Sequence, residues 1–133
     1  MNIPSEDVKD MLVAESGLGL TFAINLFIGF EPESPKNCTT IFDTPGGELE
    51  VTLSKDSGYE RPSVSIRVRN SAYPTGLLLA KSISDALHND GGIIWNSTLY
   101  TAIIVQGSPA FLDWTENGEA RFVINVDMQR RST

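Results

Sequence analysis

The sequence predicts an α+β fold: a mostly antiparallel sheet with two helices packed on one face, in a single domain of 133 residues. Three observations predict it. Residues 63–69 alternate between polar and apolar side chains without a break, which is the period of a strand with one buried face. Residues 76–88 then place apolar side chains at helical spacing. The remaining strand-like stretches follow one another in pairs instead of alternating with helices, which favours antiparallel pairing.

Composition and charge narrow the functional classes. The formal net charge of −7 and the pI of about 4.5 argue against a protein whose main task is to grip nucleic-acid phosphates. Cys38 is the only cysteine, so no intrachain disulfide or multi-cysteine metal site is expected, and a reducing compartment fits best. Signal-peptide features are lacking, and no apolar run approaches the roughly 20 residues that span a bilayer. We therefore expect no association with a membrane.

The first third of the chain is predicted to contribute one helix and two strands. Residues 5–16 suit a short helix in which Ser5 is the N-terminal cap. Residues 22–30 are apolar on both alternating faces, which predicts a strand that is covered on both sides. Residues 31–37 contain two prolines and predict a solvated loop, and the β-branched stretch 38–44 predicts a second strand.

Residues 45–61 are predicted to form a projecting hairpin arm or a mobile loop. The segment opens with a Pro-Gly-Gly turn. Leu49, Val51 and Leu53 then alternate with polar side chains, as in a strand that returns or projects. Residues 54–61 are polar and lead into the strand at 63–69.

The last third of the chain is predicted to complete the sheet. Residues 99–106 are rich in β-branched side chains and predict a strand. The Asn-Gly pair at 117–118 is a strong hairpin signal. Residues 120–129 alternate regularly and predict a long terminal strand, followed by a frayed basic tail at 130–133.

Motifs for catalysis and for metal or cofactor binding are lacking. Nucleophilic catalysis needs a nucleophile beside a placed base, and His88 is the only histidine. The sequence contains no nucleophile elbow, metal-protease motif or phosphate-binding loop. We therefore predict that the protein is not an enzyme and has no catalytic, cofactor-binding or metal-binding residues.

Two features of the sequence point to contacts with another subunit. Arg67 and Arg69 lie on the polar face of the 63–69 strand, which is either a solvated outer face or a face that meets carboxylates of a neighbour. Direct DNA binding by this face ranks third because the chain is acidic. Trp114 lies near a turn, where it either closes the edge of the core or anchors a subunit contact.

The chain also carries six short stretches that match one known family in the expected order: residues 25–32, 41–47, 59–69, 87–88, 107–109 and 117–118. Of these, the Tyr-Glu-Arg-Pro sequence that precedes the arginine-bearing strand is the most specific. With these stretches the chain resembles the bacteriophage minor capsid proteins, a family that overlaps with the tail terminator (tail completion) proteins. The resemblance covers nearly the whole chain and implies a single tail-terminator-like domain at 1–133.

This resemblance implies a structural protein of the virion. Family members assemble in the host cytoplasm. They form a ring, commonly of six subunits, at the head-proximal end of the tail tube. The ring stops tube polymerisation and docks to the head connector or stopper, so the implied partners are further copies of the chain, the tail tube protein and the connector. DNA passes through the lumen without specific binding, and an acidic wall suits this because it repels phosphates.

Other functions remain open at this point. Another head–tail connector or stopper, or a tail-tube subunit, has much the same architecture. From a different class, the chain could be a small ligand-binding or regulatory α+β domain with a pocket near Trp114. For the ring-forming function we predict subunit contacts at seven residues: Arg61, Arg67, Arg69, Leu49, Val51, Leu53 and Trp114.

Overall fold

The computed structural model describes residues 2–46, 59–88 and 92–132. The described residues form two α-helices, α1 (Pro4–Ala14) and α2 (Tyr73–Leu87), and a short 3₁₀ helix, η1 (Ser16–Leu18). They also form seven strands: β1 (Leu26–Ile28), β2 (Cys38–Thr44), β3 (Ser63–Asn70), β4 (Ile93–Trp95), β5 (Thr98–Val105), β6 (Ala110–Trp114) and β7 (Ala120–Ser132).

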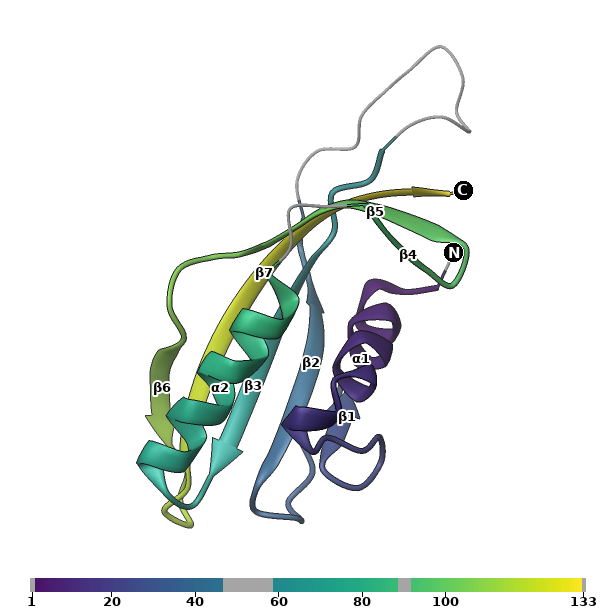
Figure 1. Cartoon of the computed structure of the whole chain (residues 1–133). Helices are drawn as coiled ribbons and strands as arrows, with labels where there is room; N and C mark the ends of the chain where they lie inside the picture. Colours follow the sequence, from purple (N-terminus) through teal and green to yellow (C-terminus); the bar gives the residue numbers. More distant parts are fainter. Residues whose placement is uncertain (1, 47–58, 89–91, 133) are drawn as a thin grey trace.

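The strands form one sheet in the order β1-β2-β3-β7-β5-β4, and β6 also pairs with β7. β7 is long enough to hold two partners: β6 pairs with its residues 120–123, and β5 pairs with residues 126–132. Among the described strands, β1 and β2 are parallel and the other neighbours are antiparallel. The sheet curls, and both helices lie on the same face of it (Figure 1). The predicted fold class is therefore confirmed.

The apolar face of the sheet and the two helices enclose the core. Val64, Ile66 and Val68 of β3 are buried on this face, as predicted, and Ile83 of α2 packs in the same cluster. Each such side chain contributes roughly 1.5–3 kcal/mol when it is removed from water. The largest fully buried side chains come from both helices and five strands: Tyr100, Phe122, Leu12, Leu26, Ile41, Ile66, Ile83, Ile103 and Ile124.

Polar contacts as well as apolar ones hold α1 to the sheet. Val8 and Leu12 are fully buried in the core. The prediction that Ser5 caps the helix is wrong, because the N-cap residue is Ile3 and no side chain caps the first turn. The Ser5 hydroxyl instead donates to Asp43 Oδ2 at 2.7 Å, so it ties the start of α1 to the end of β2.

A buried ionic network joins α1 to the far end of the sheet. Asp7 is fully buried and accepts hydrogen bonds from the Tyr100 hydroxyl and from Asn96 Nδ2. Arg130 Nη1 lies 3.6 Å from Asp7 Oδ2, and Arg130 Nη2 lies 3.0 Å from Glu60 Oε2. Burial and the bond to Asp7 raise the pKa of Tyr100. Because a buried charge must be paired, this network fixes the position of the chain end.

The ion pairs of Arg130 also hold the end of the chain in the sheet, which the sequence did not predict. β7 runs on to Ser132, so residues 130–132 are not a frayed tail. β4 and β6 are short strands that the alternation of residues did not reveal. α2 begins at Tyr73, three residues before the predicted start, because a proline in its first turn already has a helical φ.

Residues 22–30 do not form the doubly covered strand that their pattern predicted. β1 is three residues long, and the side chains of Ile24 and Phe30 are 65% and 71% exposed. The cause is a turn ahead of β1: the Asn25 side chain accepts a hydrogen bond from the Thr21 amide at 2.7 Å. This local bond competes with strand pairing, as Asn side chains often do.

Candidate subunit interface

Arg69 is part of the internal structure of the chain. Its side chain is 6% exposed, and its guanidinium holds the 31–37 loop. Nη1 donates to Glu31 Oε1 at 2.9 Å, and Nη2 donates to the carbonyls of Pro32 and Pro35 at 2.5 and 2.7 Å. Nε donates to a further carbonyl of the loop at 3.0 Å. We call this arrangement the Arg69 clamp; it tethers a loop that the sequence predicted to be solvated.

A second arginine shares the same carboxylate. Arg121 lies directly opposite Arg69 in the β3–β7 register. Its Nε donates to Glu31 Oε1 at 3.0 Å, and its Nη1 lies 3.3 Å from Asp113 Oδ2 on β6. The Glu31 carboxylate therefore sits between two guanidinium groups, and the chain of ion pairs joins the loop to β3, β7 and β6.

Arg67 lies on the same face of β3 as Arg69, but its surroundings differ. Its Nε is buried and has no hydrogen-bond partner within the described residues. Its guanidinium lies 5.2 Å from the centre of the Phe42 ring, a cation–π distance. With Glu33 and Trp114 it lines an open polar groove of about 520 Å³. Arg67 is half-buried and lines the groove, whereas the Arg69 guanidinium is bound to the 31–37 loop.

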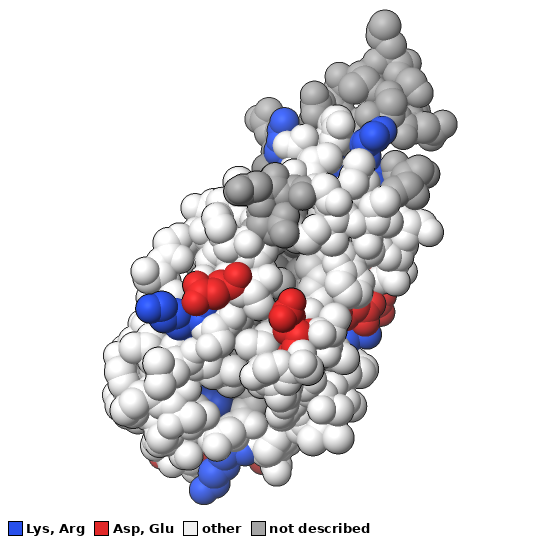
Figure 2. Space-filling model, viewed as in Figure 1, with Lys and Arg blue, Asp and Glu red and all other residues white. Residues whose placement is uncertain are grey.

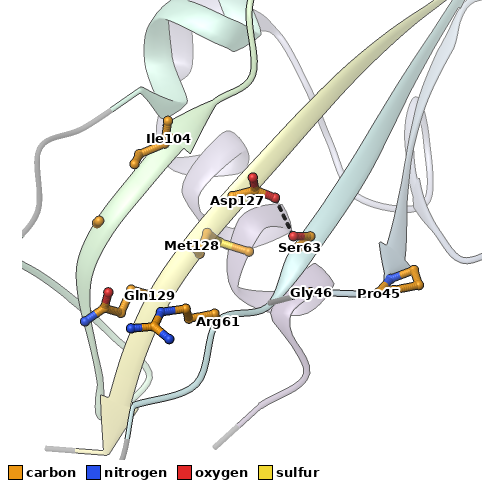
Figure 3. A pocket seen from close by; sticks show the side chains of 9 residues that line it. Pro45, Gly46, Arg61, Ser63, Ile104, Asp127, Met128 and Gln129 are labelled. Atoms are coloured by element: carbon orange, nitrogen blue, oxygen red, sulfur yellow. Dashed lines mark hydrogen bonds between the residues drawn. The ribbon is translucent and has the colours of Figure 1, made fainter. Parts of the chain in front are cut away.

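The predicted arm at 45–61 is described at its two ends. Arg61 is exposed at its base and lines a cavity of about 430 Å³ together with Asp127 and Gln129 (Figure 3). Ser63 and Asp127 are partners on the adjacent strands β3 and β7, and the Ser63 hydroxyl donates to Asp127 Oδ1 at 2.5 Å in the wall of this cavity (Figure 3). Three of the residues predicted for the interface lie outside the described residues: Leu49, Val51 and Leu53.

Trp114 belongs to an exposed cluster of aromatic rings. Its side chain is 55% exposed, and its ring centre lies 6.1 Å from that of Tyr73 and 5.7 Å from that of Phe111. Tyr73 and Phe111 in turn contact the buried Phe122 at 5.0 and 6.0 Å. We call the exposed residues Tyr73, Phe111, Leu112 and Trp114 the β6 patch.

A second exposed apolar area was missed by the sequence prediction. Phe22, Ile24 and Phe30 are exposed around β1, and we call them the β1 patch. Their regular alternation looked like that of a buried strand. The signal that could have corrected this is the pair of glycines that flank the segment, because Gly19 and Gly29 both adopt positive φ and end the extended backbone.

The described residues offer surfaces for contact, and we find no catalytic or metal-binding cluster among them. They contain no group of three or more His, Cys, Asp or Glu that could hold a metal ion. Burial raises the pKa of the Cys38 thiol, which makes it a poor nucleophile. Among the helices that the structure describes, none is long and apolar enough to cross a membrane.

These features first define a class of protein: an α+β protein with exposed apolar areas at the edges of its sheet and a groove lined by arginines. Comparison with known families narrows this class. The family model of the bacteriophage tail terminator proteins matches residues 6–131, nearly the whole chain. The chain therefore belongs to the bacteriophage tail terminator family, and it is a structural component of a phage-type particle.

The fold is also found in a solved structure. The chain is similar to a protein in the structure described as the virion of a native gene transfer agent (GTA) particle, with a TM-score of 0.67 and 14% sequence identity. The match covers 96% of this chain and 93% of the other. At this identity the likeness is one of fold. No curated protein sequence matches the chain.

Proposed function

We propose that copies of this chain close a ring on the head-proximal end of a tail tube. The ring stops growth of the tube and presents a docking surface to the head connector or stopper. The observation that carries this proposal is the family match over residues 6–131, supported by the shared fold of a protein from a gene transfer agent virion. The mechanism is geometric, so we expect no enzymatic activity and no cofactor.

The partners in this proposal are further copies of the chain, six when assembled, the tail tube protein and the connector. DNA passes through the lumen without specific binding. The net charge of −7 supports such a passage because an acidic wall repels phosphates. The finished ring is part of the virion, and its subunits assemble in the host cytoplasm.

The predicted interface residues have different roles in this proposal. Arg67 supplies positive charge in the groove for a neighbour's carboxylate, and Trp114 adds apolar area. Arg69 acts from inside, because its clamp fixes the 31–37 loop that borders the same groove. The remaining contacts in this proposal are those predicted from the sequence, at Arg61, Leu49, Val51 and Leu53.

Negative-stain imaging of the purified protein with tail tubes of its own particle tests the function. We expect a ring at one end of each tube and no further tube growth. The alternatives give other outcomes: a tube subunit forms long polymers by itself, and a stopper binds the connector while the tubes keep growing. A ligand-binding domain stays monomeric, and its melting temperature rises with metals, nucleotides or metabolites.

The Arg67→Glu variant tests the role given to Arg67. The new carboxylate should repel the group that the guanidinium binds, so the fraction of capped tubes should fall sharply. Lys81→Glu is the matched control, because it makes the same charge change at an exposed position of α2. Equal capping by the two variants would remove Arg67 from the interface.

A further inference from the structure

The two apolar patches lie at opposite edges of the same sheet. Across the lower half of the molecule in Figure 1, the strands follow in the order β1-β2-β3-β7-β6. The β1 patch and the β6 patch are therefore separated by the full width of the sheet. They also differ in their support, because the β6 patch rests on both α2 and β6, whereas the β1 patch flanks a single short strand.

Both patches are at the same level along the strands. One row of register partners crosses the whole sheet: Leu26 faces Thr39, Thr39 faces Val68, Val68 faces Phe122, and Phe122 faces Phe111. A copy placed beside this one, edge to edge, can therefore join the two patches with little shift along the strands. A contact without such a shift favours closure into a ring over growth into a helix.

The β6 patch is preorganised for a partner. The rings of Tyr73 and Phe111 lean on buried Phe122, so their positions are set by the core. Gly76 brings α2 close to this ring, because a Cβ atom at Gly76 would lie 2.7 Å from it. Rigid aromatic side chains lose little entropy on binding, which makes them suitable anchors.

The outer edge of β6 is also available. In the part of the chain that the structure describes, β6 pairs with β7 and with no other strand. An exposed apolar edge strand is a template for another chain, and proteins usually protect such edges with lysine, proline or a covering loop. Within Ala110–Trp114 the only charged side chain is Asp113, which is paired with Arg121.

Charge supports a second copy as the partner. Two copies at −7 repel each other, so they meet at lowest cost through uncharged surface. Residues 17–30, 70–80 and 92–112, which contain every residue of both patches except Trp114, carry no charged side chain. The surface over β6 and the start of α2 is correspondingly white in Figure 2.

Ion pairs lie at the borders of both patches: Lys9 with Asp10 at the β1 patch, and Arg121 with Asp113 at the β6 patch. Lys9 Nζ lies 4.9 Å from the centre of the Phe22 ring, next to the β1 patch. Asp113 and Glu116 follow Leu112 at the border of the β6 patch. Contact between unlike patches brings the Lys9–Asp10 pair toward Glu116, whereas contact between two β6 patches brings two Glu116 carboxylates together.

We propose that the β6 patch of one copy binds the β1 patch of the next copy, and that this heterologous contact repeats around the ring. The inference rests on the ring in the proposed function and names the two surfaces that build it. A cyclic ring needs two such unlike, complementary surfaces on each subunit.

Cross-linking of variants with one added cysteine tests the pairing. Ile24→Cys places a thiol in the β1 patch, and Leu112→Cys places one in the β6 patch; both side chains are exposed, so the fold should tolerate either change. The native Cys38 is buried, and the wild-type chain with a short bismaleimide is the background control. Each variant is treated alone and in an equimolar mixture, up to about 1 mM, where even weak contacts are populated.

The proposal predicts several-fold more cross-linked dimer in the mixture than in either variant alone. Cross-linking of Leu112→Cys by itself would show a contact between two β6 patches and overturn the proposal. A mixture that gives no more dimer than the wild type, with both variants melting at the wild-type temperature, would overturn it as well. Capping of tail tubes by the wild-type protein in that case would leave the proposed function intact and remove this pairing alone.

Discussion

The Arg69 clamp and the β6 patch are neighbours, linked through Arg121 and Asp113, yet they have opposite relations to the fold. The clamp consists of charged and polar groups that satisfy one another inside the chain. The β6 patch consists of aromatic groups that remain more than a third exposed. The charged groups of the clamp therefore stabilise the monomer, whereas the β6 patch leaves apolar area exposed for assembly.

The largest effect should come from breaking the clamp with Arg69→Leu. The substitution leaves Glu31 without one of its two partners and strands the carbonyls of the 31–37 loop, so stability should fall by about 3–5 kcal/mol. Urea unfolding followed by circular dichroism measures this loss. Arg67→Leu is the control: it removes no hydrogen bond between described residues and should cost less than about 1 kcal/mol. Similar midpoints for the two variants would contradict the clamp.

The next effect concerns two tyrosines, one inside the fold and one in the patch. Tyr100→Phe removes the hydroxyl that donates to buried Asp7, which should cost about 1–3 kcal/mol. Tyr73→Phe keeps the ring contacts of the β6 patch and should leave the melting temperature nearly unchanged. The comparison fails if the Tyr73 variant melts earlier than the Tyr100 variant.

A glycine pair tests whether the patch is built on the core. Gly76→Ala should destabilise the chain by about 1–3 kcal/mol, because its Cβ would overlap the Phe122 ring, and this outweighs the helix propensity gained. The matched change Gly17→Ala meets no atom within 4 Å and should be neutral or slightly stabilising. Thermal unfolding of both variants measures the difference.

The smallest effect is electrostatic and lies in the turn between β6 and β7. The Thr115 hydroxyl donates to the Glu119 carboxylate and holds its pKa below the ordinary value of 4.5. A lowered pKa in the folded state means that Glu119 adds stability above pH 4.5, and that this share is lost as the pH falls through the lowered pKa.

The Thr115→Val variant removes this hydroxyl, so the Glu119 pKa should rise toward 4.5. The acid side of the stability profile should then start to fall at a higher pH. Carboxyl titration by NMR measures the pKa, and an unchanged value would show that the hydroxyl bond does not set it.

The sequence predicted best the strands that are formed by one short, regular stretch of residues. β2 and β3 have the predicted bounds to within one residue, from β-branched residues in β2 and from alternation in β3. The prediction that β3 has one buried face is wrong, because Ser63, Ser65 and Arg69 are buried on its polar face as well. The pattern was wrong at 22–30, where Asn25 forms a turn that the period of two cannot reveal. It was also wrong at 130–132, where the ion pair of Arg130 with Asp7 depends on residues more than 100 positions apart.

The candidate interface also depends on contacts between distant residues, which a local sequence pattern does not reveal. Trp114 was predicted to be either core edge or contact, and the structure leaves it exposed in an aromatic cluster. Arg67 and Arg69 look equivalent in the sequence, and only the loop that folds over Arg69 distinguishes them. The β1 patch was missed because its apolar residues carry the pattern of a buried strand, and the glycines at 19 and 29 were the only signal against it.

The most direct test of the division between clamp and patch is the Trp114→Ser variant, mixed with tail tubes and imaged by negative stain. Because the Trp114 side chain is more than half exposed, the variant's free energy of unfolding should lie within about 1 kcal/mol of the wild-type value. We predict that it nevertheless leaves tube ends uncapped while the wild-type protein caps them. Capping at the wild-type level by this variant would contradict the assignment of the β6 patch to assembly.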